Sequence, residues 1–184
     1  MVSNEEDIER LIGGCLKNDR KAQQELYDNF YAAMIRICMR YTKNEDDAVE
    51  VLHDAFLKVF KNMKQYDARK GALSTWIRTI VIRAAIDFLS SRKVAFSPVK
   101  ENESGQPIEN TVLSKFNAQE LLALIRGLPT AAQLVFNLYV IEGYSHKEIG
   151  QALGISDGTS RWHLNEARRL LRESIRRAEG QAYE

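Results

Sequence analysis

The stretch SHKEIGQALGISDGTSRWHLNEARRLLRESI, residues 145–175, decides the fold. Ser145 followed three residues later by Glu148 is the capping-box pattern that opens a helix. Gly154 can take the left-handed conformation that ends this helix, and Ser156 can cap the next one. The inner stripe of that next helix consists of Leu164, Ala167, Leu171 and Ile175. The stretch therefore predicts a helix-turn-helix whose second helix is placed to enter a DNA major groove.

The second helix of this motif has an outer face suited to DNA. Trp162 lies about 200° around the helix from Leu164, so we expect the indole to point away from the core. Side chains that can donate to phosphates and base edges occupy the outer and flanking arcs: Arg161, Asn165, Arg168, Arg169 and Arg172. An ordinary surface helix with snorkelling arginines is the structural alternative. We expect His163 to be a plain surface or boundary residue with no metal partner.

Apolar residues at helical spacing predict a compact four-helix domain over residues 1–92. Its apolar stripes are Ile8, Leu11, Ile12, Cys15 and Leu16; Ala22, Leu26, Phe30, Ala33, Ile37 and Tyr41; Val49, Leu52, Phe56, Val59 and Phe60; and Ile77, Ile80, Val81, Ala84 and Phe88. Asn18 or Asp19, Asn44 and Ser74 are candidate caps for the last three helices. Between Met63 and Leu73 the helical pattern stops, which indicates a basic loop containing an aromatic residue.

Residues 93–117 lack any sustained period and contain serine, proline, glycine and three glutamates, which is typical of a flexible acidic linker. Helical patterning resumes near Ala118 and continues toward residue 184. No strand-like alternation and no long repeat occurs in the sequence. The predicted fold class is all-α: two small helical domains joined by a flexible linker, the C-terminal one containing the helix-turn-helix.

The net charge of +1 conceals a strong asymmetry along the chain. Residues 61–100 contain nine basic and two acidic side chains, whereas residues 1–60 contain eight and twelve. The middle segment is therefore a candidate polyanion-binding surface, with a solvated basic helix face as the alternative. Cys15 and Cys38, the two cysteines, fall on apolar stripes, so we expect buried free thiols.

Several function classes are disfavoured by the sequence. The acidic N-terminus lacks the pattern of a signal peptide, and the apolar runs are far shorter than the roughly 20 residues of a membrane span, so we expect a cytoplasmic protein without membrane insertion. Three histidines and two cysteines form no metal cluster or nucleophile triad, and no phosphate-binding glycine loop is present. We therefore expect a protein that is not an enzyme and needs no cofactor or metal.

Motifs in both halves resemble the extracytoplasmic-function sigma factors of bacterial RNA polymerase, over about residues 5–178. The C-terminal motifs are Leu128-Pro129 through Val135-Phe136, Glu142 through Ile149, Leu153 through Ser156, Gly158-Thr159 and Glu166-Ala167-Arg168. The N-terminal motifs are Asp47-Ala48-Val49-Glu50 with Asp54, Phe56, Leu57 and Phe60, then Ser74-Thr75-Trp76-Ile77, Ile80, Ile86-Asp87 and Arg92. The resemblance implies a sigma factor that directs promoter recognition and transcription initiation.

The resemblance implies that residues 1–92 dock on the clamp helices of core polymerase and melt the minus-ten element. The implied polymerase-binding residues are Asp47, Glu50, His53, Asp54 and Lys58, although an acidic start that complements the helix dipole is the plain alternative. The implied minus-ten DNA-binding residues are Tyr66, Arg69, Lys70, Trp76, Arg83 and Arg92. Aromatic faces accept stacked bases and cations follow phosphates, but Trp76 could instead belong to the core.

The resemblance further implies that residues 118–184 read the minus-thirty-five element as a duplex and contact the polymerase flap. The implied DNA-binding residues are Thr159, Ser160, Arg161, Trp162, Asn165, Arg168 and Arg169. Core polymerase, promoter DNA and an anti-sigma factor are the expected partners. Departures from the family pattern are Arg83 in place of asparagine, His53 in place of glutamine and Gly150 in place of alanine.

Three other functions remain open at this point. A helix-turn-helix regulator that binds operators as a dimer would recognise palindromic sites without polymerase. A sigma-like decoy that sequesters an anti-sigma factor would bind a partner without initiating transcription. An enzyme acting on nucleic acid has no supporting constellation of residues.

Overall fold

The computed structural model describes residues 5–91 and 118–181, and every regular element in these ranges is helical. The chain divides into two compact units, Met1–Phe88 and Leu89–Glu184, each described here by itself. The predicted all-α class is confirmed. The predicted linker, residues 93–117, and Arg92 lie outside the described residues.

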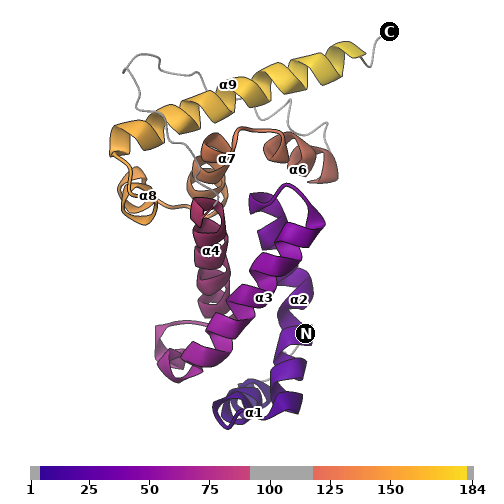
Figure 1. Ribbon diagram of the computed structural model, residues 1–184, viewed down its shortest axis with the longest axis vertical. Coiled ribbons are helices and arrows are strands. Elements are labelled where there is room, and N and C mark those ends of the chain that lie inside the picture. The colour runs from indigo at the N-terminus through magenta and orange to yellow at the C-terminus, as the bar shows by residue number, and fades with distance from the viewer. Residues whose placement is uncertain (1–4, 92–117, 182–184) are drawn as a thin grey trace. The chain divides into compact units, whose positions relative to one another are not determined.

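The first unit contains α1 (Glu5–Leu16), α2 (Arg20–Tyr41), α3 (Glu45–Asn62) and most of α4 (Leu73–Ser91), as Figure 1 shows. Asp19 caps α2 by accepting a hydrogen bond from the Lys21 amide at 2.8 Å, and Asn44 caps α3 through the Asp47 amide at 2.8 Å. Both caps agree with the sequence prediction. The segment predicted as a loop contains two short 3₁₀ turns, η1 (Met63–Gln65) and η2 (Ala68–Lys70).

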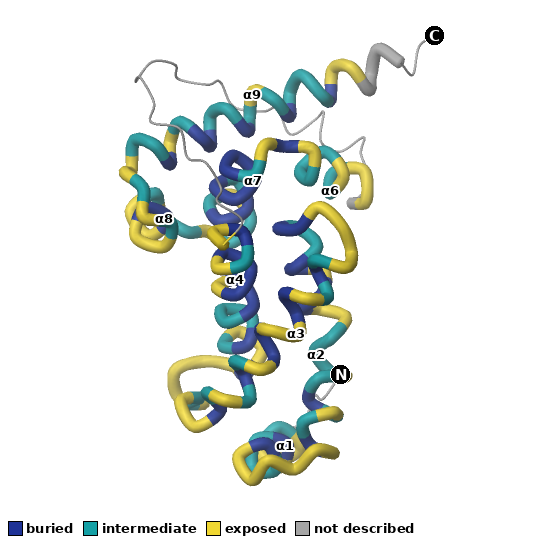
Figure 2. The backbone as a smooth tube through the Cα atoms, viewed as in Figure 1, coloured by how far each residue is buried: buried dark blue, intermediate teal, exposed yellow. Residues whose placement is uncertain are grey.

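Buried apolar side chains from every helix form the core of the first unit (Figure 2). They include Leu11, Leu26, Leu52, Phe56 and Ile77, each no more than 2% exposed. The predicted stripe of α2 was wrong at Ala33, which is exposed, because the buried face of this long helix passes through Met34 and Cys38 instead. The prediction of Ser74 as a cap was also wrong, since α4 already begins at Leu73.

Both cysteines are buried free thiols, as the sequence predicts. Cys15 is 2% exposed and Cys38 is 0% exposed. Burial raises the pKa of both thiols, that of Cys38 to about 12. Because the thiolate is the reactive form of cysteine, neither sulfur is set up for chemistry near neutral pH.

The second unit contains α6 (Ala118–Arg126), α7 (Thr130–Phe136), the π-helical turn η3 (Asn137–Ile141), α8 (His146–Leu153) and α9 (Asp157–Gln181). Leu128, Ala132, Ala167 and Leu171 form a buried apolar cluster that fixes α9 against α7. The dark blue positions along α9 in Figure 2 recur at helical spacing, which leaves the opposite side of this helix for solvent or a ligand. None of the helices in the described ranges is long and apolar enough to cross a membrane.

Candidate DNA-binding and polymerase-binding surfaces

The helix-turn-helix forms as the sequence predicts. The Ser145 hydroxyl accepts a bond from the Glu148 amide at 3.2 Å, and the Glu148 carboxylate accepts one from the Ser145 amide at 2.8 Å, which completes the capping box. Gly154 ends α8 in the left-handed conformation, with φ 67° and ψ 33°. The Ser156 hydroxyl then accepts from the Thr159 amide at 3.0 Å and opens α9. These local contacts fix where α9 begins.

The turn between α8 and α9 is tight at Gly150. The Ile155 amide donates to the Gly150 carbonyl at 3.1 Å. A Cβ atom at position 150 would lie 2.7 Å from the Ile155 carbonyl oxygen, closer than side-chain carbons approach backbone oxygens. The glycine that departs from the family pattern therefore allows a close approach of two backbone segments here.

Ser160 lies inside the second unit and not on its surface. It is 0% exposed, and its hydroxyl is 2.9 Å from Nδ1 of His146. The His146 ring also stacks on Tyr139, with the ring centroids 4.4 Å apart and the planes 22° apart. The interpretation of Ser160 as a DNA contact is therefore corrected: its hydroxyl joins α9 to α8.

Two more side chains of α9 lie differently from the expectation. His163, expected at the surface or boundary, is only 5% exposed, because its position turns toward the buried side of the helix. Trp162 is partly buried, and its ring meets the His163 ring edge-on with centroids 4.8 Å apart. Burial lowers the pKa of both His163 and His146, and the cations Arg161 and Arg168 lower that of His146 further.

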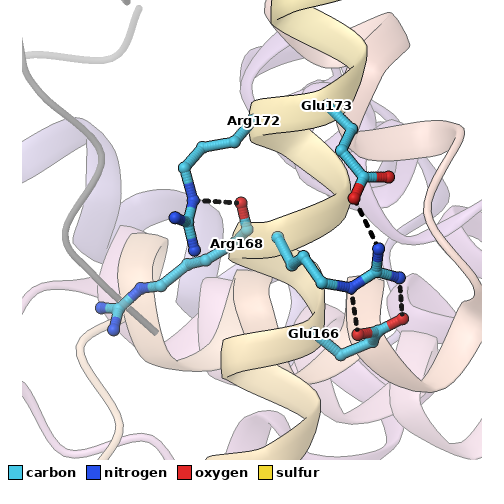
Figure 3. Close-up of polar contacts among 5 residues, drawn as sticks. Glu166, Arg168, Arg172 and Glu173 are labelled. Carbon is cyan, nitrogen blue, oxygen red and sulfur yellow. Dashed lines mark hydrogen bonds and ion pairs between the residues drawn. The ribbon is translucent and has the colours of Figure 1, made fainter. Parts of the chain in front are cut away.

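One flank of α9 carries cationic side chains directed away from the core. Arg161 is exposed, and Arg168 and Arg172 are partly buried. Nε of Arg172 donates to the backbone carbonyl of Arg168 at 3.2 Å, while the Arg168 guanidinium extends away from the helix (Figure 3). No ion pair joins Arg161 or Arg168 to any other described residue. Both guanidinium groups can therefore accept an anionic partner.

On the other flank of α9, one arginine is hydrogen-bonded to two glutamates of the same helix. Arg169 donates through Nε and Nη2 to both carboxylate oxygens of Glu166, at 2.8 and 2.6 Å. Its third contact is from Nη1 to Glu173, at 2.6 Å. Figure 3 shows both carboxylates bonded to this one guanidinium. These hydrogen bonds lower the pKa of Glu166 and raise that of Arg169.

The predicted polymerase-binding residues share the outer side of α3. Glu50, His53 and Asp54 are exposed, whereas Asp47 and Lys58 are partly buried. The Lys58 ammonium is 2.7 Å from the Asp87 carboxylate of α4, so this lysine joins the two helices. The structure thus presents three of the five side chains fully to solvent.

Sequence reasoning missed an apolar residue on the same side of α3. Leu57 is 68% exposed, and it lies beside Tyr27, His53, Phe56 and Phe60 along a groove of about 580 Å³ between α2 and α3. Tyr27 packs edge-on against Phe56 with ring centroids 4.8 Å apart. The signal was available, because Leu57 follows Glu50 and Asp54 at the spacing of one helix face. An exposed leucine that continues an aromatic groove forms an apolar patch, which is typical of a protein-binding surface.

Of the predicted minus-ten residues, the structure brings together Tyr66, just before η2, and Trp76, in the first turn of α4. The Tyr66 hydroxyl donates to the Gly71 carbonyl at 3.2 Å, and the Tyr66 and Trp76 rings lie 5.6 Å apart at 55°. The 90% exposed Arg69 side chain donates to Asp67 at 2.8 Å, which lowers the pKa of that carboxyl. Lys70 and Arg83 are exposed. Trp76 is partly buried, so one part of its ring packs and another meets solvent.

Within residues 5–91 and 118–181, no group of three or more histidine, cysteine, aspartate or glutamate side chains is arranged to hold a metal ion. The chemistry of the described surfaces is that of hydrogen bonding, stacking and charge.

Comparisons with known proteins match both units of the chain. Residues 26–94 match the family model described as Sigma-70 region 2, and residues 118–171 match the one described as Sigma-70, region 4. The chain is 25% identical to ECF RNA polymerase sigma factor SigW of Bacillus subtilis, covering 92% of this chain and 97% of that protein. It is 19% identical to ECF RNA polymerase sigma factor SigK of Mycobacterium tuberculosis, covering 92% of this chain and 94% of that protein.

A solved structure supports the fold. The sigma factor RpoE in complex with the anti-sigma factor NepR, from Bartonella quintana, superposes with a TM-score of 0.52 and 16% sequence identity, covering 83% of this chain and 96% of that chain. At this identity the likeness concerns the arrangement of the helices.

Proposed function

This chain belongs to the extracytoplasmic-function group of RNA polymerase sigma factors, and we propose that its two units divide promoter recognition between a polymerase-docking surface and a duplex-reading helix. As a sigma factor it directs promoter recognition and transcription initiation. The observation that supports this division of roles is that each unit matches a different sigma region. Each unit also exposes a surface of different chemistry.

In this proposal the predicted domain of residues 1–92, which includes the first unit, binds the clamp helices of core polymerase through Asp47, Glu50, His53, Asp54 and Lys58. Leu57 supplies an apolar anchor, since its 68% exposed side chain stands among these polar groups. In the same proposal, the melted minus-ten strand is bound by Tyr66, Arg69, Lys70, Trp76, Arg83 and Arg92. The paired rings of Tyr66 and Trp76 support stacking of an unpaired base.

The predicted domain of residues 118–184, within the second unit, binds the minus-thirty-five duplex through Thr159, Arg161, Trp162, Asn165 and Arg168. Arg161 and Arg168 support this role because neither guanidinium is engaged by a carboxylate of the described residues. The protein acts in the cytoplasm with core polymerase, and the reaction is catalysed by the polymerase and not by this chain. An anti-sigma factor is the proposed regulator, by analogy with the RpoE complex with NepR.

The test combines capture of core polymerase with run-off transcription on a genomic DNA library. We expect the full chain to bind core polymerase and to start transcription at a discrete set of promoters. Asp54→Arg is expected to abolish capture, whereas Glu9→Arg, the same charge change on exposed α1, is expected to have no effect. Tight binding to a palindromic duplex without polymerase capture would favour the dimeric regulator.

A further inference from the structure

We propose that Arg169 is a positioning residue for DNA binding, which holds the Glu166 and Glu173 carboxylates and offsets one of their two negative charges so that α9 can approach phosphates. This inference rests on the proposed duplex binding by α9. It changes the role of Arg169 from a phosphate contact, as the sequence suggested, to a group that acts through its two neighbours.

The geometry commits the Arg169 guanidinium to these carboxylates. A guanidinium has five N–H donors, and three of those on Arg169 are directed at Glu166 and Glu173 over 2.6 to 2.8 Å. The paired bonds to Glu166 use the planar edge that a phosphate would otherwise receive. A direct contact with DNA through this edge would therefore require breaking the bonds to Glu166 that the structure shows.

The two flanks of α9 differ in what they offer a polyanion. At about 100° per residue, Glu166 and Glu173 lie within about 40° of Trp162, on the side proposed to face DNA. Arg161, Arg168 and Arg172 lie about 100° from Trp162 in the opposite direction. Removing Arg169 would leave two carboxylates uncompensated beside the cationic flank, where they repel phosphates.

The same arrangement contributes little to folding. The Arg169 side chain is 46% exposed, and those of Glu166 and Glu173 are 26% and 42% exposed. Exposed ion pairs within one helix add little stability, so a variant without Arg169 is expected to fold normally. Near phosphates, the loss of one positive charge together with the release of both carboxylates is expected to weaken binding on the order of tenfold.

A double-mutant cycle separates positioning from direct contact. The full chain, Arg169→Met, the pair Glu166→Gln with Glu173→Gln, and the triple variant are titrated into a fluorescein-labelled duplex of mixed sequence at one fixed salt concentration. We expect Arg169→Met to weaken binding about tenfold in the natural background and no more than about twofold in the glutamine background. An equal or larger loss in the glutamine background would show that Arg169 acts on DNA by itself and not through the two carboxylates, which would overturn the inference.

Arg168→Met is the matched control, because Arg168 is the neighbouring arginine and is bonded to neither carboxylate through its guanidinium. We expect it to weaken binding by the same factor in both backgrounds. If Arg168→Met has no effect in either background, duplex binding by this face of α9 is wrong, and the proposed function fails separately from the inference.

A measurement without DNA tests the arrangement directly. Carbon-13 NMR follows titration of the Glu166 carboxyl, whose pKa the hydrogen bonds from Arg169 hold below its usual value. We expect this pKa to rise in Arg169→Met and to stay unchanged in Arg168→Met. A Glu166 titration that is the same with and without Arg169 would overturn the inference, whatever the binding data show.

Discussion

At the scale of single residues, the buried His163 and the partly buried His146 give the second unit a dependence on pH. Burial lowers the pKa of His163 and of His146 from the ordinary value of 6.5. The unfolded chain therefore binds protons at a higher pH than the folded unit does. The contribution of these histidines to the free energy of unfolding is fully present above about pH 6.5. It is lost as the pH falls through their lowered pKa values in the folded unit.

We predict that the free energy of unfolding of the second unit decreases as the pH is lowered from about 7 to about 5. Chemical denaturation at a series of pH values measures it. His163→Gln cannot titrate but keeps hydrogen-bonding atoms, so it is expected to flatten the pH dependence, and adding His146→Gln should flatten it further. If the free energy of unfolding of the double variant depends on pH as steeply as that of the natural chain, other titrating groups cause the dependence.

Sequence reasoning at this scale succeeded where the signal was local and failed where the partner was distant. The capping pair Ser145 and Glu148 lies within one turn, so its role was readable. Ser160 was misassigned because its partner, His146, comes from the preceding helix. The contacts of Arg169 use residues three before and four after it, but spacing alone does not decide whether an arginine turns to a neighbouring carboxylate or to DNA.

At the scale of elements, the crossing of α1 and α2 depends on a small residue at one position. A Cβ atom added at Gly14 would collide with the Cβ of Ala22 in α2, whereas one added at Gly13 would meet nothing within 4 Å. Both glycines lie in α1, so both substitutions by alanine gain similar helix propensity. They differ only in what the new methyl group meets.

We predict that Gly13→Ala stabilises the first unit by about 0.5 to 1 kcal/mol. Gly14→Ala is expected to destabilise it by about 1 to 3 kcal/mol, because overpacking outweighs the gain in propensity. Thermal and urea unfolding of the two variants measure both effects. Equal stabilisation by both would mean that α1 can move away from α2 at no cost.

Most helices were predictable from their apolar stripes, and side-chain caps marked the starts of α2, α3 and α8. The errors have physical reasons. The helix α2 spans 22 residues, and its buried side shifts gradually around the helix axis. The stripe predicted from Leu26 therefore included Ala33, whereas Met34 is the residue that is buried. The π-helical turn η3 has no apolar spacing of its own that distinguishes it from the helix before it.

At the scale of the whole molecule, the two proposed surfaces belong to different units and should be separable. Leu57 is exposed on the first unit, so its replacement should leave the fold intact. We predict that Leu57→Ser lowers the capture of core polymerase at least about tenfold, as loss of an apolar anchor does. Duplex binding by the same variant is expected to equal that of the natural chain.

Leu16→Ser is the matched control, since Leu16 in α1 is the other exposed leucine of the first unit, with 41% exposure among the described residues. It is expected to leave polymerase capture unchanged. Arg168→Met should show the converse behaviour, with normal capture and weaker duplex binding. Full capture by Leu57→Ser would remove this residue from the docking surface.

The enclosed sulfurs have a practical consequence for following this protein at work. The sequence contains two cysteines, and both are buried free thiols that thiol-directed dyes cannot reach in the folded state. Cysteines introduced at exposed positions, one in each unit, would therefore carry fluorophores without removal of the natural ones. Energy transfer between the two labels would then serve as a molecular ruler for how the units rearrange on polymerase and promoter.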